Sequence, residues 1–189
     1  MNAIWCRCLP WLAATVCATG CLRADEAGHS GKEKSVMKLT SAAFAAQQPI
    51  PAKYTGEGAD VSPPLQWNGA PAGTKGFALI CDDPDAPAGD WVHWVIYDLA
   101  PTADGLPEHV APRDTLPDGA KQGMNDFGKV GYGGPYPPTG KPHRYFFRLY
   151  ALDARLLLPP RATKAAVLRA IAGHVLAEAQ LMGTYQRAR

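Results

Sequence analysis

The sequence lacks a strong charge of either sign and, after its N-terminal region, any long apolar run. Its 19 Lys and Arg residues nearly balance 17 Asp and Glu residues, and the formal net charge is +2. No stripe of basic residues occurs, so the composition argues against nucleic acid as a partner. No later segment is apolar over the roughly 20 residues that a transmembrane helix needs. The 189 residues, of which 47% are hydrophobic, instead suit one globular domain with a tail.

Cysteine is nearly absent from most of the chain. Four of the five cysteines lie at or before residue 21, and Cys81 stands alone in the rest. A lone thiol excludes an intramolecular disulfide, so the domain must be stabilised by its core. The neighbouring Asp82 is expected to raise the pKa of this thiol, which disfavours a nucleophilic thiolate. We therefore assign Cys81 to a packed strand.

Several enzyme signatures are missing as well. The chain contains no HExxH motif and no GxSxG motif, the domain after residue 35 has no cysteine pair that could bind zinc, and only two serines follow residue 35. We therefore expect a protein that is not an enzyme and needs neither a metal nor a cofactor. The alternative from another class is an acid–base or metal-assisted hydrolase that uses Asp83, Asp85, His93 and His143.

The first residues are typical of an export signal. Residues 1–21, MNAIWCRCLPWLAATVCATGC, carry one basic residue ahead of a short apolar run and end on small residues. A buried N-terminal helix is the alternative, and Pro10 within the run argues against it. Residues 22–35 are polar, charged and aperiodic, so we interpret them as a tether before a domain over residues 36–189. The predicted location of the exported protein is the periplasm.

Cys21 leaves a second option open. A cysteine that follows small residues is similar to a bacterial lipoprotein cleavage box, although Ala18 occupies the position where that box prefers Leu. Acylation at Cys21 would anchor the exported protein to a membrane. The sequence does not choose between a free and a lipid-anchored form.

From residue 36 onward, strand-length runs alternate with Pro- and Gly-rich segments, which favours an antiparallel β architecture. Residues 76–81 (GFALIC) form a short β-rich run. Residues 90–99 (DWVHWVIYDL) are apolar on both alternating faces, which predicts a central strand with His93 on the same face as Val95. Residues 143–152 (HRYFFRLYAL) predict a second central strand.

One helix is predicted near the C-terminus. Thr163 can cap it, and the apolar residues that follow recur at helical spacing. They are Val167, Leu168, Ile171, Val175 and Leu176. His174 lies at the margin of this apolar stripe. The predicted fold class is therefore mostly β, a β-sandwich of antiparallel sheets with a C-terminal helix.

Three clusters contain residues that can form a binding site. They are the acidic turn at Asp83–Asp85, His93 in its buried strand, and the segment GYGGPYPPTGKPHRYFF that begins at Gly131. His143 and Tyr145 are two apart on a strand, so they point the same way from Cα atoms about 6–7 Å apart. Each cluster alone has a simpler explanation, because Asp before Pro starts turns and a lone buried histidine is usually a core residue. Their joint occurrence beside Gly-rich backbone indicates a site.

The order of these motifs resembles the phosphatidylethanolamine-binding protein family, and in particular its bacterial Raf kinase inhibitor-like branch. The motifs are DPDAP, WVHW, NDFG, GYGGPYPP, PHRY and GHVLAEAQLMGTYQR. The resemblance covers the chain from about residue 37 to residue 187. It implies a β-sandwich with an anion pocket at one end, which accepts phosphate, phosphonate or phospholipid head groups.

Matched motif by motif, the resemblance implies a set of ligand-binding residues. These are Asp83, Asp85, Trp91, His93, Gly133, Gly134, Pro135, Pro137, His143 and Tyr145. Two positions depart from the usual bacterial pattern, which has Cys in place of Tyr136 and Gly in place of Gln186. We expect Tyr136 to narrow the mouth of the pocket or to change which head group enters.

An anion pocket that contains an aspartate needs a physical explanation, because like charges repel. A carboxylate bonded to His93 or to His143 favours the imidazolium form, which then donates a hydrogen bond to the ligand. Tyr145 adds a hydroxyl donor. We also expect the backbone N–H groups of Gly133 and Gly134 to form an anion-binding nest, which the adjacent prolines stiffen.

We predict a non-catalytic protein that binds phosphate or phospholipid head groups. A regulatory role for this binding is a further possibility that the resemblance leaves open. The alternative within the resemblance is an inhibitor module for a protease or another protein partner, and the sequence names no target. The expected partner is thus a phosphate-bearing small molecule or head group. Formation of a homodimer is left open by the sequence.

Overall fold

The computed structural model describes residues 36–187, which fold as two antiparallel sheets with one α-helix and one short 3-10 helix. The smaller sheet has the order β1-β2-β5 and the larger sheet the order β6-β4-β3-β7-β8. The elements are β1 Lys38–Thr40, η1 Ala52–Tyr54, β2 Leu65–Asn68, β3 Gly76–Asp83, β4 Trp91–Leu99, β5 Gly105–Leu106, β6 Lys121–Gln122, β7 His143–Leu152, α1 Lys164–Ile171 and β8 Val175–Tyr185. The leader, the tether and Cys21 lie outside the described residues, so these assignments stay predictions.

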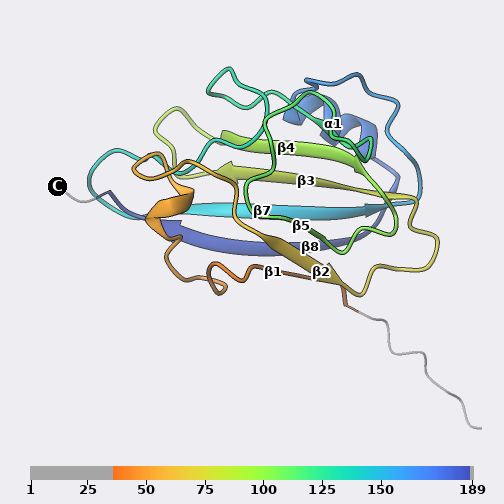
Figure 1. The fold of residues 1–189 in the computed structure, drawn as a ribbon, viewed down its shortest axis with the longest axis horizontal. Helices are drawn as coiled ribbons and strands as arrows, with labels where there is room; N and C mark the ends of the chain where they lie inside the picture. The colour runs from red at the N-terminus through yellow and green to blue at the C-terminus, as the bar shows by residue number, and fades with distance from the viewer. Residues whose placement is uncertain (1–35, 188–189) are drawn as a thin grey trace, which may run out of the picture. The chain divides into compact units, whose positions relative to one another are not determined.

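The main core lies between the two sheets. Leu39 and Trp67 of the smaller sheet belong to the same buried cluster as Leu79, Trp94 and Phe147 of the larger sheet. The opposite face of the larger sheet carries a second core, in which strand residues pack against α1. Figure 1 shows the long strands of the larger sheet side by side, with α1 near β4. The predicted β-sandwich with a helix near the C-terminus is confirmed.

The strands predicted over residues 76–81, 90–99 and 143–152 are all present, as β3, β4 and β7. All residues of β3 are buried because β4 and β7 flank it and packed layers cover both of its faces. Cys81 lies in β3 with 1% of its surface exposed, and burial together with the nearby Asp82 carboxylate raises the pKa of its thiol. The assignment of Cys81 to a packed strand is therefore confirmed.

A β-bulge at His93 changes the direction in which this residue points. Asp82 of β3 pairs with Val92, whereas the residue before Asp82 pairs with Trp94, so His93 is the extra residue in β4. A bulge bends its strand and re-aims a side chain, and bulges are common next to functional sites. Val95 packs toward α1, whereas His93 lies on the inner side together with Trp94. The expectation that His93 shares a face with Val95 was wrong because strict alternation takes no account of a bulge.

Helix α1 is shorter than the apolar spacing predicted. Thr163 caps it as expected, since its side-chain oxygen accepts a hydrogen bond from a backbone N–H of the first turn. The helix ends at Ile171, and Gly173 then adopts a φ of 81°, a left-handed conformation that is typical of helix termination. His174 lies in this turn, and Val175 begins β8. The predicted extension of the helix through residues 175 and 176 was wrong.

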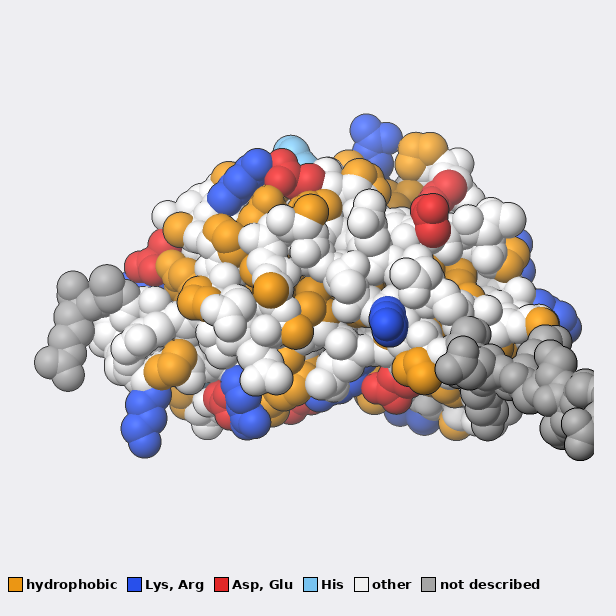
Figure 2. Space-filling model, turned by 90° about the horizontal axis from the view of Figure 1, so that it is seen from below, with side chains coloured by type: hydrophobic (Ala, Val, Ile, Leu, Met, Phe, Trp, Pro, Cys, Tyr) orange, Lys and Arg blue, Asp and Glu red, His pale blue; other side chains and the backbone are white. Residues whose placement is uncertain are grey.

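The surface agrees with the balanced composition. Figure 2 shows one face of the molecule, on which Lys and Arg, Asp and Glu, and hydrophobic side chains are interspersed and no single charge sign gathers. In the part of the chain from residue 36 to residue 187, no helix has the length and apolarity needed to span a bilayer.

The packing of α1 yields a stability prediction. Ile171 is 3% exposed in the core under α1, whereas Leu168 on the same helix is 37% exposed. Ile171→Ala should therefore lower the free energy of unfolding by about 2–5 kcal/mol, because it leaves a cavity in a packed core. Leu168→Ala, the matched control, should change it by less than about 0.5 kcal/mol. Urea unfolding followed by tryptophan fluorescence measures both, and equal effects of the two substitutions would contradict the assigned packing.

Candidate functional site

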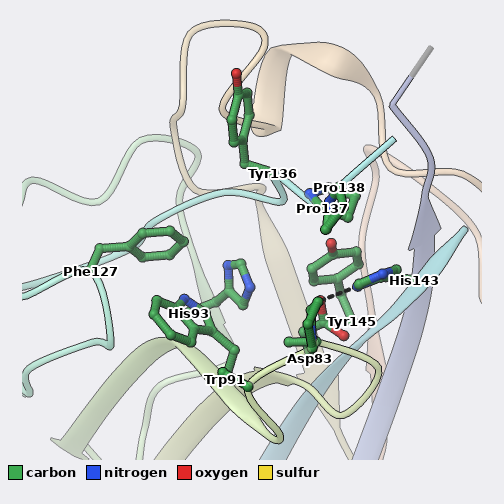
Figure 3. Close-up of a pocket in the computed structure, with 12 residues that line it drawn as sticks. Asp83, Trp91, His93, Phe127, Tyr136, Pro137, Pro138, His143 and Tyr145 are labelled. Carbon is green, nitrogen blue, oxygen red and sulfur yellow. Dashed lines mark hydrogen bonds and ion pairs between the residues drawn. The ribbon is translucent and has the colours of Figure 1, made fainter. Parts of the chain in front are cut away.

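A pocket of about 230 Å³ lies where three strands of the larger sheet meet. β3 ends at Asp83, whereas its antiparallel neighbours β4 and β7 begin at Trp91 and His143. Antiparallel pairing therefore brings residues that are far apart in the sequence to one end of the sheet. The pocket, shown in Figure 3, is lined by Asp83, Ala86, Pro87, Ala88, Trp91, His93, Phe127, Tyr136, Pro137, Pro138, His143 and Tyr145.

Asp83 is a buried carboxylate with both oxygens bonded inside the protein. Its Oδ2 accepts a hydrogen bond from Nδ1 of His143 at 2.8 Å, and its Oδ1 accepts one from the backbone N–H of Asp85 at 2.8 Å. The side chain of Asp83 is only 4% exposed. The sequence left open whether the aspartate pairs with His93 or with His143, and the structure pairs it with His143.

His93 is held in one tautomer by the loop that covers it. Its Nδ1 lies 2.6 Å from the carbonyl oxygen of Gly133. A carbonyl only accepts, so Nδ1 carries the proton and Nε2 of the neutral ring is an acceptor. Burial lowers the pKa of His93, and this effect exceeds the opposing effects of the Gly133 carbonyl and the nearby carboxylates. The lowered pKa favours a neutral ring at His93 over the imidazolium.

Tyr145 places a hydroxyl in the pocket that has no hydrogen bond of normal geometry within residues 36–187, although the Asp83 carboxylate lies near it. The residue is 1% exposed, and its hydroxyl is a buried polar atom without a hydrogen-bond partner. Burial, and secondly the nearby carboxylate of Asp83, raise the pKa of this phenol, so the hydroxyl keeps its proton. The ring meets that of His93 edge to face, with 5.1 Å between centroids. A buried donor without a partner is unusual in a protein and marks a place where a ligand can bind.

Gly133 and Gly134 do not form the expected donor nest. The N–H of Gly133 donates to the carbonyl of His93, and the N–H of Gly134 donates to Oδ1 of Asp60 at 2.6 Å. A Cβ on Gly133 would lie 2.7 Å from the ring of Phe127. These glycines therefore let the loop pack closely around the pocket. The prediction that their N–H groups bind an anion was wrong because those groups are already bonded.

The structure brings together most, but not all, of the residues implied by the resemblance. Asp83, Trp91, His93, Pro137, His143 and Tyr145 line the pocket. Gly133 and Gly134 line an adjacent hollow instead, and Asp85 and Pro135 line neither. The carboxylate of Asp85 accepts two side-chain hydrogen bonds from Arg144, which lower its pKa to about 2. Asp85 thus supports the site through its backbone N–H to Asp83.

Phe127 is a wall residue that sequence reasoning missed. It is 40% exposed and follows Asn125 in a turn, where an aromatic residue is conspicuous. Its ring packs edge to face against Trp91 at 5.6 Å and against His93 at 5.2 Å between centroids. Figure 3 shows these three rings on one side of the pocket, opposite the pair of Asp83 and His143. An aromatic residue within the polar, turn-forming run NDFGK was the signal in the sequence that could have identified it.

The arrangement does not resemble a metal centre. Among the residues that the structure describes, no group of three or more His, Cys, Asp or Glu side chains is placed to hold a metal ion. The pocket instead has a polar floor of two imidazoles, a phenol and a carboxylate, and a rim of aromatic and proline residues. The fold and site together define a small β-sandwich protein with a partly apolar pocket at one end of its larger sheet.

Comparison with known proteins identifies the family. The family model described as Phosphatidylethanolamine-binding protein matches residues 40–186. The chain is 54% identical over 151 residues to a UPF0098 protein of Methanothermobacter thermautotrophicus, an alignment that covers 80% of this chain and 99% of the relative. It is 46% identical over 155 residues to a UPF0098 protein of Aquifex aeolicus, covering 81% and 90% respectively. The chain belongs to the phosphatidylethanolamine-binding protein family.

Solved structures agree with this assignment. A putative phosphatidylethanolamine-binding protein homologue from Chlamydia trachomatis superposes with a TM-score of 0.75 at 41% identity, covering 82% of this chain and 99% of that one. Escherichia coli YbcL, described as a new member of the mammalian family, gives a TM-score of 0.75 at 35% identity, with 80% and 99% covered. The predicted family and fold class are therefore confirmed.

The hydroxyl of Tyr145 yields a stability prediction with a matched control. Tyr145→Phe should change the free energy of unfolding by less than about 0.5 kcal/mol, because its hydroxyl makes no hydrogen bond of normal geometry within residues 36–187. Tyr132→Phe should lower it by about 1 kcal/mol, because the Tyr132 hydroxyl donates to the carbonyl of Tyr54 at 2.8 Å. Thermal and urea unfolding measure both changes. A larger loss for Tyr145→Phe than for Tyr132→Phe would show that Tyr145 has a structural partner.

The burial of His93 yields a second prediction. Its pKa in the folded protein lies below the model-peptide value of about 6.5. As the pH falls below 6.5, the imidazole binds a proton in the unfolded chain before it does so in the folded protein. The free energy of unfolding therefore decreases with falling pH until the folded pKa of His93 is reached. NMR titration of the ring protons, assigned with a His93→Gln variant, should give a midpoint below 6.5. A midpoint at or above 6.5 would contradict the neutral state assigned to His93.

Proposed function

We propose that this protein reversibly binds phosphate, or the phosphate of an ester or phospholipid head group, in the pocket of Asp83, His93, His143 and Tyr145, without transforming it. The observation that carries the proposal is the buried, unpartnered hydroxyl of Tyr145 on the pocket wall. A phosphate oxygen is a strong acceptor that satisfies this donor. Family membership supports a binding role.

The polar groups of the floor are complementary to a protonated phosphate. Tyr145 donates from its hydroxyl, and a protonated His143 donates from Nε2 because its Nδ1 is engaged with Asp83. Neutral His93 offers an Nε2 lone pair, which accepts from a P–OH group. The carboxylate of Asp83 is bonded on both oxygens and supplies the counter-charge for His143. Mildly acidic pH, where phosphate is a monoanion with a P–OH group for neutral His93, therefore favours binding.

The rim of the pocket suits an organic substituent on the phosphate. Trp91, Phe127, Tyr136 and Pro138 present partly or fully exposed rings along the lining, and such surfaces contact the carbon atoms of an ester. No Ser, Thr, Cys or Lys side chain among residues 36–187 lines the pocket to act as a nucleophile, although His143 and Asp83 form a histidine–carboxylate pair. We therefore propose binding without catalysis. With the leader predicted at residues 1–21, we extend the proposal to a periplasmic location for this activity.

Calorimetric titration with inorganic phosphate tests the proposal. The wild-type protein should bind phosphate more tightly at pH 6 than at pH 8. Tyr145→Phe should weaken binding about tenfold at both values, because a hydrogen bond to a charged group contributes about 1.5 kcal/mol. Tyr132→Phe, the control, should keep wild-type affinity. Absence of binding, equal affinities at the two pH values, or an unaffected Tyr145→Phe variant would each contradict the proposed mode of binding.

A further inference from the structure

A second pocket of about 200 Å³ adjoins the first and is not used by the proposed phosphate contacts. It is lined by Gly56, Asp60, Phe127, Lys129, Gly133, Gly134 and Tyr136. Phe127 and Tyr136 line both pockets, so the two hollows share their aromatic walls. His93, which lines the first pocket, is hydrogen-bonded to Gly133, which lines the second. The two pockets therefore adjoin at these shared walls.

The second pocket contains one carboxylate and one ammonium, both exposed. Asp60 is fixed in place, since its Oδ1 accepts the N–H of Gly134 at 2.6 Å and its backbone adopts a φ of 52°. Within residues 36–187, neither Asp60 nor Lys129 takes part in an ion pair. Both charges are thus available to a ligand.

Tyr136, the ring between the two pockets, is held by contacts on two sides. The guanidinium of Arg187 lies 3.8 Å from the centroid of the ring, and its Nη1 donates to the carbonyl of Pro137 at 3.4 Å. On the other side, Gly56 leaves room for the ring, because a Cβ there would lie 2.9 Å from it. Figure 3 shows Tyr136 at the edge of the first pocket with its hydroxyl pointing away. The shared wall is therefore a built part of the fold.

We propose that the second pocket binds the amino-carboxylate end of a phosphate ester whose phosphate occupies the first pocket. Lys129 pairs with the carboxylate of the ligand, Asp60 pairs with its ammonium, and the rings of Phe127 and Tyr136 contact its carbon atoms. A purely anionic end would meet the Asp60 carboxylate, and a purely cationic end would meet the Lys129 ammonium. A zwitterion satisfies both charges. This inference rests on the proposed phosphate site and names its ligand class.

Two pairs of probes test the inference by calorimetry at low salt. O-Phosphoserine is compared with phosphoethanolamine, and O-phosphotyrosine is compared with phosphotyramine. Within each pair, the two probes differ only by the carboxylate. The two pairs differ in the length of the carbon spacer between the phosphate and the amino group. In at least one pair, the probe with the carboxylate should bind about fivefold more tightly than the probe without it, which is the effect expected of one exposed ion pair. Lys129→Gln should abolish this preference, whereas Lys38→Gln on β1, with the same change of charge, should keep it. Asp60→Asn, which can still accept from Gly134, should weaken the binding of phosphoethanolamine about fivefold.

Inorganic phosphate separates the two possible failures. If phosphate binds normally to all variants but neither carboxylate raises affinity, or if the preference survives Lys129→Gln, the inference is overturned and the phosphate site stands. If phosphate itself does not bind, the proposed function fails and the inference with it. A short-chain phosphatidylserine carries the same end group as a phosphodiester. If phosphatidylserine binds and Lys129→Gln weakens that binding, the natural ligand is a lipid head group. If only the monoesters bind, the natural ligand is a soluble phosphate ester.

Discussion

The site depends on the need of a buried carboxylate for hydrogen-bond partners. Asp83 sits at the end of β3 with almost no access to water, and an unpaired charge there would be strongly destabilising. One oxygen is bonded by the turn at Asp85 and the other by His143, the first residue of β7. This pair ties the ends of two strands together and sets the direction of the His143 ring. The hydroxyl of Tyr145, two residues further along β7, then lies in the same pocket.

The opposite wall is made by a local break in regular structure. The bulge in β4 turns His93 inward, and the loop at Gly133 closes over it with a hydrogen bond in each direction between the two residues. Burial keeps this ring neutral, whereas the Asp83 carboxylate faces the other ring, that of His143. Two imidazoles in one pocket thus have different partners and different roles. The division follows from backbone geometry, because only one of the two rings reaches the aspartate.

Much of the fold was predictable because it follows from local patterns. The apolar runs at residues 76–81, 90–99 and 143–152 are long and clear enough to identify three central strands, and Thr163 marks the start of the helix. The end of the helix was misplaced, because the apolar spacing continues into β8 and only the turn at Gly173 separates them. The bulge was missed for a similar reason, since it arises from pairing with β3 and has no signature within β4 itself.

For the candidate site, the order of motifs along the sequence determined the family and indicated Asp83, His93, His143 and Tyr145. Tertiary structure alone decided how they are used, because hydrogen-bond partners come from segments distant in the chain. It assigned Asp83 to His143, engaged the N–H groups of Gly133 and Gly134 within the protein, and placed Phe127 on the wall. Residue types thus specify which donors and acceptors are present, whereas folding determines which of them stay free for a ligand.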